Sequence, residues 1–404
     1  MRRPMRSVSQ RIREYNKDLL TEMVQIKYTL MAENMFRFFR GTNHLFYEDF
    51  SKTKAIPPSP LAWICGDLHL ENFGSYKGDN RLVYFDLNDF DESILAPASW
   101  ELARIVTSIL VAFNILKIEK EKATRMAQLF LKSYSATLSK GKPYYIERNT
   151  AKGIVCTFLK AVAKRKKKEL LQKRTIKNDD ELSILLDDPR HFEIDPFLKR
   201  ELEHHITQWI IYNHDSPYNY KVIDSVFRLA GTGSVGLKRY AFLLKSVNTK
   251  GKYLLVDMKQ ARASALSPYV SVPQPQWGSE AERVVAVQQR MQNVPPALLS
   301  HSIFKNEPYL IQEMQPVKDS INFKLIKERY RDIYQVIDDM ATLTASAQLR
   351  SSGRQGAAVA DELIVFGQNL QWQEAILEYA GQYAKKVKTD YAQYLKDFKK
   401  GDFS

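Results

Sequence analysis

The sequence predicts an α+β fold with two lobes, in which both ends of the chain build a helical large lobe and a β-rich small lobe is inserted between them. Long segments with helical periodicity at both ends, and glycine-punctuated β-rich runs between them, support this prediction. The expected helices cover residues 8–50, 97–138, 149–175 and 196–213, and helices return from about residue 321. The expected domains are 1–220 for the large lobe, 221–318 for the small lobe, and 319–404 for the helices that complete the large lobe.

The composition indicates a folded protein in a reducing compartment. Hydrophobic residues make up 44% of the 404 residues and aromatic residues 11%, enough to build a core. Cys65 and Cys156 are too few for a disulfide framework or a zinc site. The basic N-terminus lacks the apolar core of a signal peptide, and the longest apolar run, Ile109 to Leu116, is too short to span a bilayer. We therefore expect a cytoplasmic protein with no membrane partner.

The net charge of +14 is unevenly distributed. Residues 160–177 are rich in Lys and Arg and are expected to form a basic helix, which gives way to acidic residues within 179–188. Such a helix can attract a polyanion or nucleic acid. More often it is a solvated face balanced by its acidic neighbours, and we favour that interpretation. A nucleic-acid partner is therefore compatible with the sequence but not favoured.

The most informative segment is WICGDLHLENFGSYKGDNRLVYFDLNDFDE, residues 63–92. Asp67 and Asn72 lie five residues apart, and Asp86 follows an apolar run. Phosphoryl transfer from ATP needs one carboxylate to orient or deprotonate the acceptor hydroxyl, and oxygen ligands for Mg²⁺. We therefore predict that Asp67 is catalytic and that Asn72 and Asp86 bind Mg²⁺. The alternative is an ordinary polar loop, since Asp, Asn and Gly are common in turns.

A glycine-rich segment lies far downstream, RLAGTGSVG at residues 228–236. A dinucleotide-binding loop would open into a helix, but here two β-like runs follow, 240–247 and 253–258, joined by a turn. A glycine-rich hairpin of this kind covers ATP phosphates in kinases, and Lys259 at the end of the second run occupies the position of the kinase phosphate-binding lysine. The predicted nucleotide-binding residues of this region are Gly231, Gly233, Ser234, Gly236 and Lys259.

A helix is predicted over residues 279–292, capped by Ser279. In a kinase small lobe the helix at this place pairs an acidic residue with the lysine. Three candidates stay open as the partner of Lys259: Glu280, Glu282 and Gln288.

An edge strand is predicted to run into a linker that Pro316 closes. In kinases the main chain of such a linker hydrogen-bonds the adenine. The predicted base-binding residues are therefore Gln312, Glu313 and Met314.

The order of these parts is reversed relative to an ordinary kinase, because the catalytic loop precedes the small lobe. Residues 332–352 form an amphipathic helix of the kind that runs immediately before a kinase catalytic loop. A circular permutation would produce this order, and folded domains tolerate one when their termini lie close together. We therefore predict that residues 343–350 pack beside the Asp67 loop.

Several motifs together resemble the domain-of-unknown-function 2252 family: GDLHLENFG, FDLNDFDE, FRG at residues 39–41, RLAGTGSVG and MKQARAS. The resemblance extends from about Phe36 to the C-terminus. It implies a circularly permuted fold similar to protein kinases and aminoglycoside phosphotransferases. It also implies a catalytic role for Asp67, metal binding by Asn72 and Asp86, and phosphate binding by Lys259. Two residues depart from the pattern: Cys65 stands where aminoglycoside kinases have His, and Gln260 stands where the family tends to have Glu.

Three functions follow from these motifs. The leading one is an ATP- and Mg²⁺-dependent phosphotransferase that acts on an unidentified, small hydroxylated acceptor. The second is transfer of AMP to protein, which would use the same metal and lysine groups. The third is a non-catalytic protein that binds a nucleotide or nucleic acid; the presence of a residue suited to act as general base argues against it.

Overall fold

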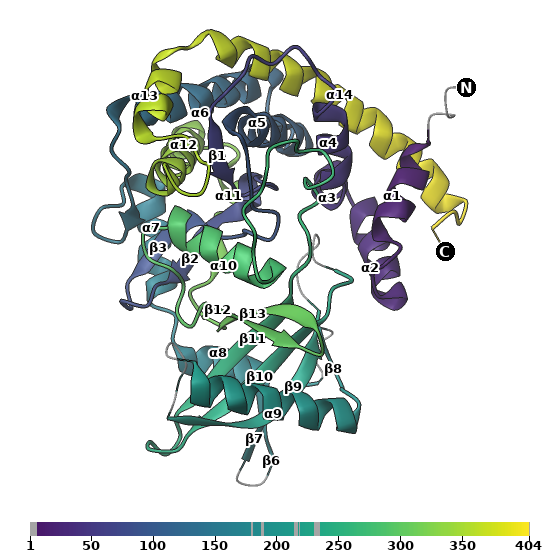
Figure 1. Ribbon diagram of the computed structural model, residues 1–404, viewed down its shortest axis with the longest axis vertical. Coiled ribbons are helices and arrows are strands. Elements are labelled where there is room, and N and C mark those ends of the chain that lie inside the picture. Colours follow the sequence, from purple (N-terminus) through teal and green to yellow (C-terminus); the bar gives the residue numbers. More distant parts are fainter. Residues whose placement is uncertain are drawn as a thin grey trace.

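The computed structural model describes residues 6–178, 181–186, 190–213, 217, 219–229 and 235–403. They form an α+β protein, with a helical body at one end of the long axis and a six-stranded sheet at the other (Figure 1).

Helices from both ends of the chain build the helical body. The N-terminal half supplies α1 (Val8–Asn16), α2 (Thr21–Ala32), α3 (Met35–Gly41), α4 (Asn43–Phe50), α5 (Ala98–Ile115) and α6 (Lys120–Lys140). The C-terminal part supplies α11 (Phe323–Ile326), α12 (Tyr330–Ser351), α13 (Ala360–Gln368) and α14 (Gln371–Lys399). Helix α12 packs on α6 and α14 packs on α5, so both ends of the chain share one hydrophobic core.

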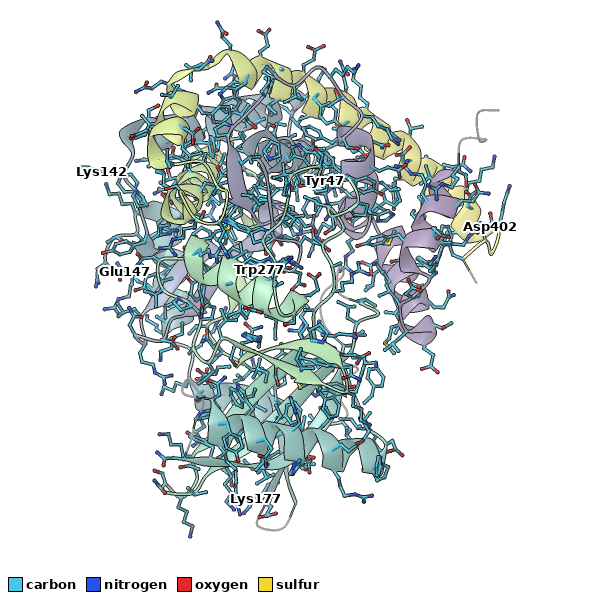
Figure 2. The ribbon with its side chains drawn as sticks, viewed as in Figure 1. Tyr47, Lys142, Glu147, Lys177, Trp277 and Asp402 are labelled. Carbon is cyan, nitrogen blue, oxygen red and sulfur yellow. The ribbon has the colours of Figure 1, made fainter. Side chains whose placement is uncertain are left out.

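Two features characterise this core. Tyr47 of α4 is fully buried among the side chains that fill the body (Figure 2). Among the described residues, α5 is the one helix long and apolar enough to cross a bilayer, but 78% of it is buried inside the protein.

Short strands and one 3₁₀ turn hold the loops of residues 63–92 against the helices. Strand β1 (Leu61–Ile64) pairs with β4 (Ile94–Pro97). A second sheet has the order β14-β2-β3-β5, with β14 at Asp319–Ser320, β2 at Phe73–Lys77, β3 at Val83–Leu87 and β5 at Ile146–Glu147. The 3₁₀ turn Leu70–Asn72 leads directly into β2.

The six-stranded sheet is antiparallel, with the order β12-β13-β11-β10-β9-β8. Its strands are β8 (His191–Phe192), β9 (Tyr220–Arg228), β10 (Arg239–Ser246), β11 (Tyr253–Gln260), β12 (Ser300–Phe304) and β13 (Glu307–Glu313). Helix α9 (Pro196–Tyr212) shares a hydrophobic cluster with these strands, and α10 (Glu280–Met291) packs against β12 and β13. The predicted hairpin after Gly236 is therefore present as β10 and β11.

The predicted helical segments are present, although turns divide them. Residues 8–50 form four helices and residues 97–138 two, and Ser279 caps α10 as expected. The single basic helix predicted over 160–177 is wrong. Helix α7 (Gly153–Ala163) ends inside this range, and α8 (Lys167–Arg174) begins after an extended Lys166. Strand β6 (Thr175–Asn178) then pairs with β7 (Glu181–Ile184).

Two residues of the basic segment form ion pairs with acidic residues at the end of β13 and in β14. Arg165 lies 2.5 Å from Asp319, and Lys167 lies 2.6 Å from Glu313. Glu313 is largely buried, so this pair is shielded from water more than most surface ion pairs.

Candidate active site

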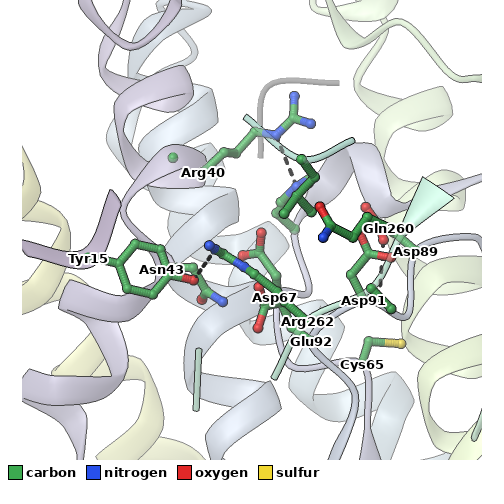
Figure 3. Close-up of a pocket in the computed structure, with 14 residues that line it drawn as sticks. Tyr15, Arg40, Asn43, Cys65, Asp67, Asp89, Asp91, Glu92, Gln260 and Arg262 are labelled. Carbon is green, nitrogen blue, oxygen red and sulfur yellow. Dashed lines mark hydrogen bonds between the residues drawn. The ribbon is translucent and has the colours of Figure 1, made fainter. Parts of the chain in front are cut away.

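A cavity lies where the helical body meets the six-stranded sheet, and we call it the cleft cavity (Figure 3). Its lining comes from helices α1, α3 and α4, from loops 65–69 and 89–92, and from residues 237 and 260–262 of the sheet and its connections. Four carboxylates line it, those of Asp67, Asp89, Asp91 and Glu92. Its volume is about 80 Å³.

A glycine makes the sharp turn that presents Asp67. Gly66 has φ +82°, and a Cβ there would lie 2.1 Å from the carbonyl oxygen of Glu92. Any larger residue would therefore separate loops 65–69 and 89–92. The N–H of Cys65 donates to Glu101 on α5 at 2.6 Å, which fixes the start of the turn.

The predicted packing of residues 343–350 beside this loop is present. Gln348 of α12 donates to the second carboxylate oxygen of Glu101 at 2.9 Å. The C-terminal helix and the Asp67 loop thus share one buried carboxylate, although their residues lie far apart in the sequence. Burial raises the pKa of Glu101 to about 7.

Asp67 forms an ion pair with a fully buried arginine. Arg104 of α5 donates to Oδ1 of Asp67 from Nη2 at 2.7 Å and from Nε at 3.1 Å. The guanidinium also lies 3.6 Å from the ring centroid of Phe39. Burial raises the pKa of Asp67 to about 6, although Arg104 opposes the shift. Because both arginine bonds go to Oδ1, the other oxygen is the one suited to take a proton from a ligand.

Asn72 is tied to the same loop. Its Nδ2 donates to the main-chain oxygen of Asp67 at 2.6 Å, and the residue is 4% exposed. The amide nitrogen is thereby used, which leaves Oδ1 as the atom that can coordinate a cation. Asn72 thus contacts the main chain of the predicted base, although Asn72 itself does not line the cleft cavity.

Asp86 does not line the cleft cavity. It is buried in β3, its Oδ1 accepts from the N–H of Leu87 at 2.9 Å, and Arg350 of α12 lies 3.4 Å from Oδ2. The pKa of Asp86 rises to about 6 because of burial. Asp89 does line the cavity. Its side chain is exposed there, but desolvation by the surrounding protein and the charge of Asp91 raise its pKa. The placement therefore favours Asp89 over the predicted Asp86 as the carboxylate that faces a cation.

Lys259 does not pair with the predicted helix. Its Nζ forms an ion pair with Asp91, and this pair holds the pKa of Asp91 below its usual value although burial acts in the opposite direction. All three candidate partners of Lys259 in α10 are engaged elsewhere: Glu280 with Arg283, Glu282 with the N–H of Gly278, and Gln288 with Gln292. The lysine thus meets an acid from loop 89–92, and it does not meet Asp86.

Helix α10 contributes a buried arginine instead. Arg283 is 6% exposed, and its Nη2 donates at 3.0 Å to the carbonyl oxygens of Asp91 and Arg262. It therefore ties the acidic loop to the segment that follows β11. An acidic partner was predicted on this helix, and the buried arginine was not. The signal for it was a basic residue among the apolar positions of the helix.

A cluster of two arginines, Arg228 and Arg239, lies beside Lys259. Asp257, which is 2% exposed, lies 2.6 Å from both Arg228 and Arg239, and the two arginines hold its pKa far below the usual range despite burial. Arg239 is also paired with Lys259 in the register of β10 and β11. Two arginines share one carboxylate here, so the cluster carries net positive charge.

The main chain predicted to bind a base, residues 312–314, is partly occupied. The N–H of Glu313 donates to Ala297 at 3.1 Å and the N–H of Met314 donates to Leu255 at 2.9 Å. These two groups are therefore not free to bind a nucleotide base, which corrects the expectation for the linker.

The glycine-rich segment is described only at its end. Gly231, Gly233 and Ser234 lie outside the described residues. Gly236 has φ +104°, and its carbonyl oxygen accepts from the N–H of Leu20 at 3.2 Å. Gly236 thus contacts the connection between α1 and α2, and the sequence did not predict this contact.

Arg104 was not predicted from the sequence. It lies on α5, on which Leu102 is fully buried in the core. A lone arginine within the apolar α5 was nevertheless a signal, because a charge buried in a core needs a partner.

The fold and the cavity define an α+β protein with an acidic cleft bordered by buried basic residues. The chain belongs to DUF2252, a family described as "uncharacterized protein conserved in bacteria", whose model matches residues 19–397. This range includes the whole six-stranded sheet and most of the helical body and cleft cavity, but not α1 or its cavity-lining Tyr15. No curated protein and no solved structure matches the chain.

Proposed function

We propose that this protein is an ATP- and Mg²⁺-dependent phosphotransferase with a circularly permuted, kinase-like two-lobed fold, acting on a small hydroxylated molecule. The main support is Asp67, which has a raised pKa, one oxygen bound by Arg104, and a place in the same cavity as Asp89 and Asp91. A carboxylate so placed suits a general base near neutral pH.

The residues present fit a magnesium ion. The side chain of Asp89 is exposed, but the protein around its carboxylate and the charge of Asp91 raise its pKa, and a cation would relieve the repulsion between the two carboxylates. Asn72 Oδ1 and Asp89 would hold the ion. The described residues hold no group of three or more His, Cys, Asp or Glu side chains arranged for a metal, so phosphate oxygens and water would complete the coordination. Bound there, Mg²⁺ would neutralise charge on the phosphates.

The basic residues at the sheet suit the phosphates of ATP. Lys259 is held by Asp91 in the free protein and would turn to phosphate when ATP binds, while Arg239 and Arg228 would add positive charge behind it. A cavity of about 80 Å³ is smaller than a nucleotide. ATP binding would therefore require the ion pair between Lys259 and Asp91 to separate and the cleft cavity to widen.

The proposed reaction uses this chain's own groups as follows. The acceptor hydroxyl donates its proton to Asp67, and its oxygen forms a bond to the γ-phosphorus. The bond from that phosphorus to the β,γ-bridging oxygen breaks, and ADP leaves with the bonding electron pair. Arg104 would hold Asp67 in place and receive no proton itself.

Incubation with ATP labelled at the α or the γ position tests the proposal. We expect Mg²⁺-dependent transfer of the γ label, and loss of that transfer in Asp67→Asn. Transfer of the α label would indicate AMP transfer. Transfer of neither label, without Mg²⁺-dependent binding of ATP, would overturn the proposal.

A further inference from the structure

The floor of the cleft cavity contains a buried side chain without a partner. Asn43, the first residue of α4, lines the cavity and is 5% exposed. Neither its Oδ1 nor its Nδ2 has a hydrogen-bond partner within the described part of the chain. A buried amide left without hydrogen bonds is unfavourable, so a ligand that supplies them is bound more tightly. Because a carboxamide offers both a donor and an acceptor, it matches a hydroxyl group, which also offers both.

A rigidly held cation lies in the same cavity. The Nη2 of Arg262 donates to the hydroxyl of Tyr15, and the guanidinium lies 4.7 Å from the centroid of the Tyr15 ring. Tyr15 in turn stacks on His44, with ring centroids 3.9 Å apart and an interplanar angle of 10°. The position of the guanidinium is thus fixed before any ligand arrives.

This arginine has no carboxylate of its own within ion-pair distance among residues that the structure describes. Three other basic residues near the cavity do have one: Arg40 pairs with Glu71, Arg104 with Asp67, and Lys259 with Asp91. Glu92 also lines the cavity, but its side chain accepts from the N–H of Ala265. Arg262 therefore stands as the cation that an anionic group of a ligand would meet.

The surroundings of Arg262 support a positive field at this end of the cavity. Lys27 is 1% exposed, its Nζ donates to Asn16 at 2.8 Å, and it lies 5.7 Å from the centroid of the Tyr15 ring. Burial lowers the pKa of Lys27 to about 7. The charge of Arg262 acts in the same direction, whereas the charges of Glu92 and Asp67 oppose it.

We infer that Asn43, Tyr15 and Arg262 form the acceptor subsite, which takes a small molecule carrying one anionic group, a carboxylate or a phosphate, in addition to its hydroxyl groups. Asn43 would bind a hydroxyl, Arg262 would bind the anionic group, and Asp67 would take the proton of the reacting hydroxyl. The inference rests on the proposed function, because it assigns the acceptor of the same phosphoryl transfer.

The test is a panel of matched acceptors assayed with γ-labelled Mg·ATP. Glycerate, gluconate and glycerol 3-phosphate carry the anionic group, and glycerol and glucitol are the corresponding neutral polyols. We expect label in at least one anionic acceptor, with kcat/KM at least about tenfold above its neutral counterpart. The carboxylates and the phosphate ester distinguish the two sources of negative charge.

Two variants connect the preference to the subsite. Arg262→Met should remove the preference for the anionic acceptor, and Asn43→Ala should raise the KM for that acceptor about tenfold. Calorimetric affinity for Mg·ATP should be unchanged in both. Arg37→Met is a matched control, because Arg37 is a partly exposed arginine on α3 that pairs with Glu33 outside the cavity.

Failure of this inference differs from failure of the proposed function. Equal or better transfer to the neutral polyols, no transfer to any panel member by a protein that binds Mg·ATP, or an unchanged preference in Arg262→Met would overturn the subsite. A wild-type protein that does not bind Mg·ATP would instead overturn the proposed function.

Discussion

Two ion pairs border the cleft cavity, and they differ in construction. Arg104 and Asp67 both belong to the helical body, and the arginine is fully buried and donates twice to one oxygen. Lys259 and Asp91 come from the six-stranded sheet and from loop 89–92, and their side chains are 11% and 28% exposed. The first pair is internal to one core, whereas the second pair spans the junction between two parts of the molecule.

The difference indicates separate roles. Arg104 also donates to the carbonyl of Phe39 at 3.0 Å, so its position is fixed by the core and the Asp67 carboxylate is preorganised. Lys259 is bound chiefly by one carboxylate that an arriving phosphate could replace. We therefore interpret the Asp67 pair as part of the catalytic framework and the Lys259 pair as the contact that a ligand would exchange.

The largest effect is expected from Asp67→Asn, which removes the base from the preorganised pair. Because general-base catalysis contributes about 10²–10⁴-fold, the rate of γ-label transfer should fall by that factor while Mg·ATP affinity changes little. Quenched-flow measurement of transfer, with calorimetry on the same variant, checks both parts. Undiminished transfer would show that Asp67 is not the base.

Arg104→Met should be the most destabilising change at the cavity. It leaves the buried carboxylate of Asp67 without its cation, and breaking such a pair costs about 3–5 kcal/mol in the free energy of unfolding. Lys122→Met is the matched control, because Lys122 and Glu119 form an exposed pair on α6 worth about 0–1 kcal/mol. Similar urea denaturation curves for the two variants would contradict the distinction.

The raised pKa of Asp67 predicts two opposite pH effects. Transfer requires the ionised base, so its rate should fall about tenfold per pH unit below pH about 6. Stability should move the other way. The pKa in the unfolded chain is about 3.9, so the folded state binds the extra proton between about pH 4 and 6, and the free energy of unfolding should decrease as the pH rises through that window.

The contribution of Asp67 can be isolated from those of Asp86 and Glu101, whose pKa values are also raised by burial. The difference in stability between the wild type and Asp67→Asn should show the decrease, because the other two groups are common to both proteins. A difference that does not vary with pH would mean that the pKa of Asp67 is not raised.

A smaller effect separates Asp89 from Asp86. Asp89→Asn should weaken Mg²⁺-dependent ATP binding by about tenfold, because it removes one charged oxygen ligand. Asp86→Asn should leave the Mg²⁺ dependence intact, since that side chain lies against Arg350 and outside the cavity lining. The reverse result would restore Asp86 as the metal ligand.

The sequence predicted the elements better than the contacts between them. Helical periodicity located α12, whose apolar residues Val336, Met340 and Leu343 are all buried, and the turn between the two β-like runs located the β10–β11 hairpin. Local pattern determines such elements. It does not determine partners across the chain, so Lys259 was expected to meet α10 and instead meets Asp91.

The Asp67 loop illustrates the same limit at the site. The spacing of Asp67 and Asn72 indicated a shared loop, and the side chain of Asn72 donates one hydrogen bond to the main-chain oxygen of Asp67. That Arg104 would hold the carboxylate, and that Asp86 would face Arg350, depended on how α5 and α12 pack around the loop. Those contacts arise from tertiary packing, which no spacing within residues 63–92 encodes.

The most direct test of the account is calorimetric titration of Mg·ATP and of ATP without Mg²⁺ into the wild type, Lys259→Met and a control, Lys305→Met. Lys305 pairs with Glu201 away from the cavity. We predict Mg²⁺-dependent binding to the wild type and the control, weakened about tenfold or more in Lys259→Met because a phosphate contact is lost. No binding to the wild type, or equal affinity in all three proteins, would contradict the claim that the sheet and the acidic loop form a nucleotide site.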